Sequence, residues 1–327
     1  MAKKRVLSGM QPSGLLHLGN LMGALDNWRK LQDEYECYYF IADWHALTTQ
    51  YADTSNVRRF IHEMVIDWLA AGIDPEKSVI FQQSRLPEHA VLHVLLSMIT
   101  PLPWLERVPT YKEKMEQVQD KDLHTYGFLG YPVLQAADIL IYKADFVPVG
   151  IDQLPHLELT REICRRVNAF YGEVLPEPQP LLTQYPKLLG TDGRKMSKSY
   201  NNTINLSDSP GEITKKIMAM VTDPARVRRQ DPGNPDVCPL FALDRIFAPK
   251  EWCDHVDVEC RRAGIGCVDD KKELLKHLLA YLKPIQDKRK ELSADPGKIA
   301  GIIAEGSAKA RALAQNTLAE VNEAMKL

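Results

Sequence analysis

The sequence of 327 residues has no long apolar run and no strong excess of charge of either sign. No segment reaches the ~20 consecutive apolar residues of a membrane-spanning helix, so we expect no membrane association. The basic start "MAKKRVLSGM" lacks the apolar stretch that follows in a signal peptide. Because the formal net charge is only −2, a polyanionic partner would have to be bound by local basic patches.

Cysteine is also scarce, and the common phosphate-binding loops are missing. Six cysteines are scattered along the chain without the spacing of a disulfide framework, which predicts reduced thiols and a cytoplasmic protein. The chain contains neither GxxxxGK[ST] nor a strand-linked GxGxxG. A nucleotide site in this protein would therefore have a different design.

What is present is an alternation of strand and helix patterns over the first 200 residues. Strands are predicted over 4–10, 37–47 and 78–84, a helix over 56–73, and a change from helix to strand over 131–150. Strands separated by helices predict an α/β fold with a doubly wound parallel sheet of the Rossmann-like type. Beyond residue 200 the patterns are mainly helical, which predicts a C-terminal helical domain over 201–327.

Two short stretches carry chemistry. "MQPSGLLHLGN" (10–20) joins the first strand to a helix, and a glycine-rich turn at a helix start suits a phosphate group. "GTDGRKMSKSYNN" (190–202) places Lys195 and Lys198 on a second glycine-flanked loop, where two ammonium groups suit a polyphosphate. The turn alone would be read as an ordinary tight turn, but the pair indicates a nucleotide site.

These stretches resemble the two signatures of the class I aminoacyl-tRNA synthetases. "PSGLLHLGN" resembles the HIGH signature, and "KMSKS" is identical to the second signature. The stretches "ADWHALTT", "YKEK", "YPVLQAADILIY", "VPVGIDQ" and "GSAKARALAQNTLAEVNEAM" resemble the bacterial tryptophanyl branch of that family, from residue 6 to the C-terminus. The resemblance implies a ligase that activates L-tryptophan with ATP and Mg²⁺ and transfers it to tRNA(Trp).

The resemblance implies a role for each matching residue. Those expected around ATP are Gln11, Pro12, Ser13, His17, Gly19, Asn20, Gly150, Ile151, Asp152, Leu188, Leu189, Lys195, Met196, Ser197, Lys198 and Ser199. Catalytic roles fall to Gln11, His17, Lys114, Lys195 and Lys198. The tryptophan pocket is expected from Gly9, Tyr131, Gln135, Asp138, Val147, Val149 and Gln153.

Asp138 is the residue expected to select the amino acid. Indole offers one N–H donor and no acceptor, and Asp138 matches the carboxylate that accepts this bond in the family. Gln135 departs from the pattern, since many tryptophan enzymes have methionine there and tyrosine enzymes have glutamine. A tyrosyl-tRNA synthetase is therefore the alternative function.

The resemblance also implies the division of the chain and its partners. Residues 1–200 would be the catalytic domain with the helices of a homodimer interface, and 201–327 the anticodon-binding domain. Basic residues expected near RNA are Arg226, Arg228, Arg229, Arg261, Arg262, Lys271 and Lys272, although a solvated charged face is the alternative for about half of them.

Cys238, Cys260 and Cys267 resemble part of an iron–sulfur motif found in some tryptophan enzymes. The fourth cysteine of that motif is replaced by Asp270, and a carboxylate is a poorer cluster ligand than a thiolate. We expect a remnant that binds no iron.

Two further functions remain open from the sequence. One is a small nucleotidyltransferase of the same superfamily, whose chains usually lack the helical tail. The other is a non-catalytic RNA-binding paralogue, which predicts loss of the lysines or of the turn.

Overall fold

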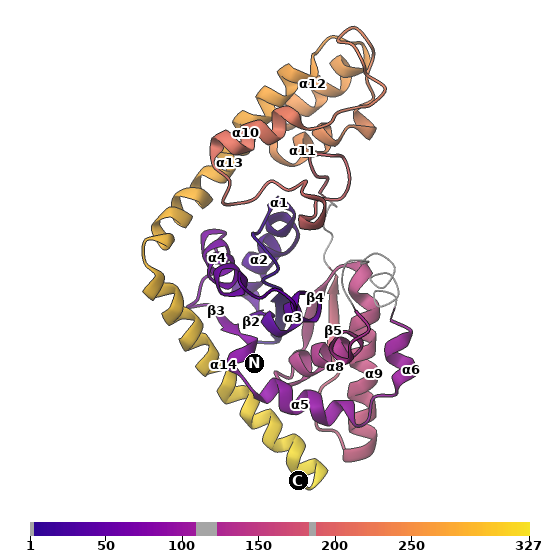
Figure 1. Ribbon diagram of the computed structural model, residues 1–327, viewed down its shortest axis with the longest axis vertical. Coiled ribbons are helices and arrows are strands. Elements are labelled where there is room, and N and C mark those ends of the chain that lie inside the picture. Colours follow the sequence, from indigo (N-terminus) through magenta and orange to yellow (C-terminus); the bar gives the residue numbers. More distant parts are fainter. Residues whose placement is uncertain (1–2, 109–122, 183–187) are drawn as a thin grey trace.

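The computed structural model describes residues 3–108, 123–182 and 188–327. A parallel sheet of five strands lies in the middle of an elongated molecule (Figure 1). The strands are β1 (Arg5–Met10), β2 (Glu36–Ile41), β3 (Ser78–Gln82), β4 (Phe146–Val149) and β5 (Gln179–Leu182). Helices around the sheet are α1 (Leu18–Asn20), α2 (Asp26–Glu34), α3 (Asp43–Gln50), α4 (Val57–Ala70), α5 (Glu88–Ser97), α6 (Leu102–Glu106), α8 (Tyr126–Leu140) and α9 (Leu154–Tyr171).

The sheet has the order β3-β2-β1-β4-β5, which confirms the predicted doubly wound fold. The order reverses between β1 and β4, and crevices at such reversals are the usual ligand sites of open parallel sheets. Alternate strand residues enter the two separate cores that flank the sheet, as Val6 and Leu7 show on β1. Burial of both faces is what a parallel sheet covered by helices requires.

Two strand predictions need correction. Residues 37–47 were expected to form one strand, but β2 ends at Ile41 and α3 begins at Asp43. The Asp43 carboxylate accepts from the backbone N–H of Ser84 (3.0 Å) and from Gln82 Nε2 (2.7 Å), which ties this corner to the end of β3. The predicted strand over 78–84 ends as β3 at Gln82, before a 3₁₀ turn over Gln83–Arg85. Strand β5, whose four residues include a proline, was not predicted.

The helices after residue 200 are α10 (Pro210–Ala219), α11 (Pro239–Phe247), α12 (Lys250–Arg261), α13 (Cys267–Ser293) and α14 (Pro296–Met325). The first three gather at one end of the molecule with the start of α13, which then runs down to the sheet (Figure 1). The division at residue 200 remains a prediction. None of the helices in the described ranges has the length and apolar character of a membrane span.

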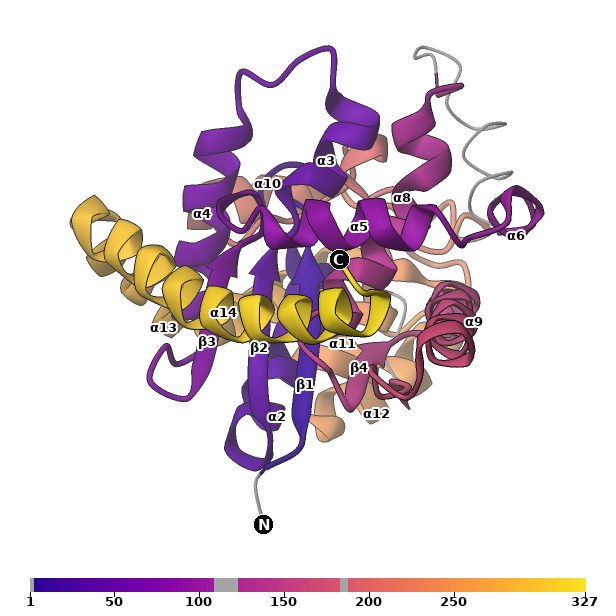
Figure 2. The same ribbon diagram turned by 90° about the horizontal axis from the view of Figure 1, so that it is seen from below.

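Helix α14 packs against the edge strand β3 and runs across the direction of the strands (Figure 1, Figure 2). Ser307 Oγ accepts from the backbone N–H of Gln82 at 3.3 Å, so the helix satisfies a group on the open edge of the sheet. Gly306 permits this approach, since a Cβ atom there would lie 1.9 Å from the carbonyl oxygen of Ile80.

We expect Gly306→Ala to destabilise the fold by about 1–3 kcal/mol, because the methyl group would push α14 off β3. Gly301→Ala is the matched control on the same helix, since a Cβ atom there meets nothing within 4 Å. The control should be neutral or stabilising by up to ~1 kcal/mol through helix propensity. Urea unfolding measures both, and an equal effect of the two changes would contradict the close packing.

Candidate active site

A cavity of about 1130 Å³ opens where the sheet order reverses between β1 and β4. It brings together most of the residues predicted from the sequence. Those that line it are Gly9, Gln11, Ser13, His17, Gly19, Asn20, Tyr131, Gln135, Asp138, Val147, Val149, Gly150, Ile151, Gln153, Leu188, Lys195, Met196, Ser197, Lys198 and Ser199.

Four predicted residues are not placed in this lining. Pro12 and Leu189 are next to it in sequence but are not lining residues. Asp152 belongs to a short 3₁₀ turn, Ile151–Gln153, and its side chain lies outside the described part of the structure. Lys114 falls in the segment 109–122, which is not described.

The turn after β1 is held by its own side chains. His17 caps α1, accepting at Nδ1 from the backbone N–H of Gly19 (3.1 Å), while Asn20 Oδ1 accepts from the His17 N–H (3.1 Å). Burial and then the nearby Lys198 charge lower the pKa of His17 to about 4. The imidazole is therefore neutral at pH 7, and because Nδ1 is an acceptor, the proton resides on Nε2.

The loop 190–202 is fixed by Asn202, a residue that was not predicted from the sequence. This buried side chain accepts from the Ser197 N–H (2.8 Å) and donates to Asp192 Oδ1 (2.7 Å) and the Lys195 carbonyl (3.2 Å). Lys198 then reaches back across the cavity, and its Nζ donates to the Gly14 carbonyl at 2.9 Å. The two signature stretches, some 180 residues apart, are thus in direct contact.

The Lys198 ammonium group lies in an unusual environment. Burial lowers its pKa to about 8, and the negative charge of Asp67 partly opposes this effect. Gly14 makes room for the lysine: its φ is +144°, and a Cβ atom there would lie 3.1 Å from Lys198 Cδ. A half-buried cation whose one hydrogen-bond partner among the described residues is a carbonyl oxygen can bind an anionic group.

Asp138 is fully buried at the base of the cavity within a network of side chains. Gln83 Nε2 donates to both carboxylate oxygens (2.8 and 2.9 Å), His45 Nε2 lies 2.8 Å from Oδ2, and His89 Nδ1 lies 2.6 Å from Oδ1. Burial raises the pKa of Asp138, but the bonds from the two histidines outweigh it and leave the pKa at about 2. The carboxylate is ionised, so both histidines donate to it.

The sequence predicted Asp138 as a site residue but did not predict its hydrogen-bond partners. The partners of Asp138 lie 49 to 93 residues away along the chain. His45 has a sequence signal, since "ADWHA" follows a strand. Gln83 and His89 have none. On the far side of the ring, His89 Nε2 lies 2.6 Å from the hydroxyl oxygen of Tyr142, which extends the network.

The remaining walls of this part of the cavity are mostly apolar. Val147 and Val149 come from β4, and the Phe40 ring lies over Gly9, where a Cβ atom would be 2.4 Å from the ring. Opposite them, the Tyr131 hydroxyl lies 2.7 Å from His156 Nε2. A flat apolar group that carries one polar donor suits this space.

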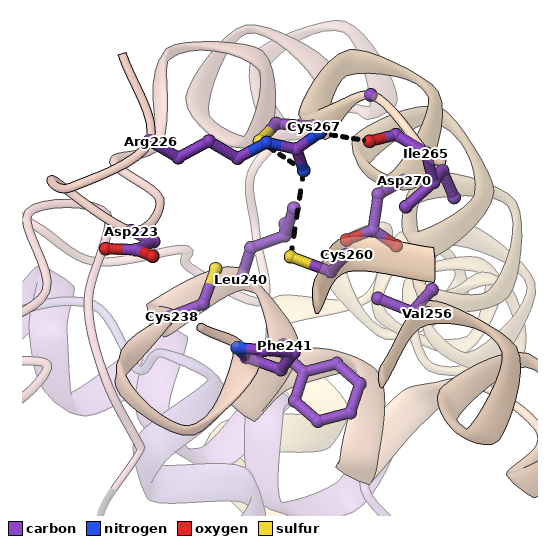
Figure 3. A pocket seen from close by; sticks show the side chains of 12 residues that line it. Asp223, Arg226, Cys238, Leu240, Phe241, Val256, Cys260, Ile265, Cys267 and Asp270 are labelled. Carbon is purple, nitrogen blue, oxygen red and sulfur yellow. Dashed lines mark hydrogen bonds between the residues drawn. The ribbon is translucent and has the colours of Figure 1, made fainter. Parts of the chain in front are cut away.

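The cysteine motif gathers elsewhere, among the helices after residue 200. Figure 3 shows Cys238, Cys260, Cys267 and Asp270 around a small pocket that also contains Arg226. Arg226 Nη1 donates to Cys260 Sγ (3.6 Å) and Cys267 Sγ (3.8 Å). Asp270 accepts from the indole N–H of Trp252 at 3.2 Å.

These residues do not fit an iron–sulfur cluster. Cluster ligands are thiolates, whereas burial raises the thiol pKa of Cys238 and Cys260 and raises the pKa of Asp270 to about 6. The guanidinium group already bonds the two sulfurs. Among the residues that the structure describes, no group of three or more Cys, His, Asp or Glu side chains is placed to hold a metal ion.

Two of the basic residues expected near RNA are buried instead. Arg226 donates through Nη2 to the carbonyl oxygens of Arg229 and Ile265, and Lys271 Nζ donates to those of Met218 and Met220. The prediction is wrong for these two side chains, which tie loops to helices. Arg228, Arg229, Arg261, Arg262 and Lys272 are exposed.

Comparison with known proteins agrees with this geometry. The family described as tRNA synthetases class I (W and Y) matches residues 2–283. The tryptophan–tRNA ligase of Thermotoga maritima is 56% identical over 325 residues, with 99% of each chain covered. That of Aquifex aeolicus is 45% identical over an alignment 393 positions long, gaps included, which covers 99% of this chain and 100% of the relative. The crystal structure of tryptophanyl-tRNA synthetase from Campylobacter jejuni complexed with ADP and tryptophan has a TM-score of 0.89 at 35% identity, covering 99% of this chain and 100% of that one.

The chain therefore belongs to the class I tRNA synthetases for tryptophan and tyrosine. The two full-length relatives given above are tryptophan–tRNA ligases, and the chain belongs with them rather than with the tyrosine enzymes. This confirms the resemblance carried by the two signatures. It decides against the tyrosine alternative that Gln135 had kept open.

Proposed function

We propose that the protein charges tRNA(Trp) with L-tryptophan in two steps. In the first, a tryptophan carboxylate oxygen attacks the α-phosphorus of ATP, the bond to the β-phosphate bridging oxygen breaks, and pyrophosphate leaves with that electron pair. In the second, a ribose hydroxyl of the terminal tRNA adenosine attacks the carbonyl carbon and AMP leaves. The observation that carries the proposal is the single cavity shared by both signature stretches and Asp138.

The ATP half of the cavity would be formed by the turn 11–20 and the loop 195–199. Phosphoryl transfer needs positioning and charge stabilisation more than covalent help from the protein. Neutral His17 offers an N–H donor at Nε2, while Lys195 and Lys198 supply positive charge for the phosphates. Mg²⁺ would enter with the nucleotide and neutralise phosphate charge, since it is commonly held through substrate phosphates.

The amino-acid half would be the space between Gly9, Val147, Val149 and Tyr131, with Asp138 at its base. All four lone-pair sites of the Asp138 carboxylate are occupied by side-chain donors. For the indole N–H to donate to Asp138, one of the present donors must give up its hydrogen bond to the carboxylate. Gln83 is the candidate, because it is a neutral amide that bonds both oxygens, whereas each histidine bonds one.

Amino-acid-dependent ATP–pyrophosphate exchange tests this function, with tryptophan and tyrosine measured in parallel. Exchange with tryptophan alone, followed by charging of tRNA(Trp), is the expected result. Exchange with tyrosine would overturn the amino-acid assignment. Exchange without tRNA charging would favour nucleotidyl transfer to a small metabolite, and the absence of any exchange would favour a non-catalytic RNA-binding protein.

We propose further that residues 201–327 bind the anticodon through some of the exposed arginines and lysines around α12. RNA recognition of this kind combines phosphate contacts with reading of unstacked bases. A cytoplasmic location remains a prediction from the scattered cysteines.

A homodimer is supported by an apolar face on α5, α6 and α8. Val91, Val94 and Met98 lie on one side of α5, and Met98 and Tyr126 are 76% and 68% exposed. Leu102 extends the patch onto α6. Contiguous apolar patches of this kind mark interaction sites. Tyr126 of the patch and Tyr131 of the cavity both line a second pocket of about 350 Å³. A second copy of the chain bound to the patch would therefore lie next to the amino-acid site and support it.

Met98→Glu combined with Val94→Glu should convert the dimer to a monomer of 37.1 kDa. The reason is that two carboxylates would lose their hydration in the interface. Sedimentation equilibrium at micromolar protein measures the mass. Val258→Glu, on an exposed apolar residue of α12, is the control and should leave the mass unchanged. An unaltered mass for the double variant would place the interface elsewhere.

A further inference from the structure

Helix α13 connects the helical group after residue 200 with the sheet (Figure 1). Near its end, the buried Arg289 enters the space beside α4. Its Nη1 is paired with Asp67 Oδ1, and its Nη2 lies 2.6 Å from Glu63 Oε2. A guanidinium is suited to such a site because its planar fork can hold two carboxylates at once.

Asp67 links this ion pair to the candidate ATP site. It is 1% exposed. The backbone N–H of Leu16, next to His17, lies close enough to its carboxylate to lower the pKa of Asp67. Burial raises the pKa of Asp67 to about 7, while the charge and hydrogen bond of Arg289 oppose that rise. Arg289 therefore favours the ionised form, whose charge also acts on Lys198.

A second side chain of α13 reaches the other side of the same turn. Gln286, three residues before Arg289 and hence on the same face of the helix, donates to the Asp208 carbonyl at 2.9 Å. The segment that Gln286 holds pairs with the turn, since Leu206 N donates to Leu16 O (2.9 Å) and Leu18 N to Ile204 O (3.0 Å). Both contacts of α13 thus converge on residues 16–18.

We propose that Arg289 and Gln286 are positioning residues through which α13 sets the geometry of the ATP-binding turn. The inference rests on the proposed function. Through hydrogen bonds and the charge of Asp67, α13 would couple the helices assigned to RNA binding to the nucleotide half of the cavity. Pro284 lies just before the two residues within α13, where the missing N–H removes one helical hydrogen bond and allows a small bend.

Arg289→Met is the principal test. The Asp67 carboxyl loses its cation and becomes protonated in its buried site, so its negative charge no longer acts on the turn at Leu16 or on Lys198. The KM for ATP in pyrophosphate exchange should rise about tenfold, within the 5–150-fold range of typical couplings between sites. The dissociation constant of tryptophan, from fluorescence titration, should change less than about twofold. In the described part of the chain, the hydrogen bonds of Asp138 and its partners include none to α13.

A double-mutant cycle separates this link from a general loss of stability. Asp67→Asn should raise the KM for ATP similarly, and the double variant D67N/R289M should raise it no further, since both changes act on one contact. Lys288→Met is the matched control: this neighbouring cation is exposed, pairs only with Glu291 among the described residues, and should leave the KM unchanged. If Arg289→Met fails to fold, Arg289→Lys keeps one of the two ion pairs and serves in its place.

An unchanged KM for ATP in Arg289→Met, or additive effects in the cycle, would overturn the link. Wild-type exchange activity is measured first. Its absence would remove the proposed function, whereas normal wild-type exchange with an unaltered variant would remove only the link through α13.

Discussion

Replacement of Asp138 by alanine should nearly abolish tryptophan activation while leaving ATP binding within about twofold of wild type, because α8 meets the cavity away from the turn and loop assigned to the nucleotide. The carboxylate is buried and satisfies three side-chain donors, so its removal leaves His45, His89 and Gln83 without their acceptor. In a binding site, truncating one partner of a buried, hydrogen-bonded charge pair costs about 2–5 kcal/mol of binding free energy. That energy corresponds to a loss on the order of 10²–10³-fold in kcat/KM for tryptophan.

The measurement is pyrophosphate exchange with tryptophan as the varied substrate, together with ATP binding by calorimetry. Asp138→Asn is the second variant, since it keeps the volume and places an N–H₂ group where the indole N–H needs an acceptor. Retained tryptophan affinity in either variant would contradict the pocket assignment. Thr160→Val is a control at another buried polar position on a neighbouring helix, where the hydroxyl bonds only to the His156 carbonyl among the described residues.

Lys198→Ala should lower the rate of activation on the order of 10²–10³-fold, with tryptophan affinity changed less than about twofold. The ammonium lies inside the cavity, 2.9 Å from the Gly14 carbonyl oxygen. There it would stabilise the negative charge that develops on the phosphates during transfer. Pre-steady-state formation of the adenylate measures this rate. Lys215→Ala, an exposed lysine on α10, should have no effect. An unaltered rate for Lys198→Ala would remove the residue from the mechanism.

The same lysine predicts a pH dependence. Because burial lowers its pKa to about 8, the ammonium is fully charged well below pH 8 and becomes neutral as the pH rises through that value. The kcat/KM for ATP should therefore fall above about pH 8, and His17, with a pKa near 4, adds no change there. Lys198→Arg should retain charge and flatten the decline. A wild-type profile flat to about pH 10 would contradict this explanation.

Much of the sheet was predictable because its signals are local. Apolar runs between amphipathic helices identify the first three strands and predict that they pair in parallel, and the glycine-rich turn lies directly after β1. The end of β2 was not predictable in this way, because Asp43 stops the strand through bonds to residues about 40 positions away. Local propensity carries no information on such a partner.

The site residues also differ in whether their signal is local in the sequence or arises only in the folded protein. The signature stretches are recognisable by their spacing, and the structure places nearly all of them in one cavity. The donors around Asp138 were not recognisable, since histidine and glutamine on separate elements give no pattern along the sequence. Asn202 was missed although it adjoins the KMSKS stretch, because only the folded loop shows what its amide bonds. Arg226 was misassigned for a related reason: a charged residue in a basic stretch gives no sign that it will be buried.

The position of α14 has a consequence for the order of events during protein synthesis. Its residues leave the ribosome after all five strands, yet they cover the outer edge of β3. Until then the nascent sheet carries an unprotected edge of the kind that recruits other strands. A ribosome-bound chain stopped before Pro296 should thus be a good client for chaperones, and the final step of folding should wait until α14 is released.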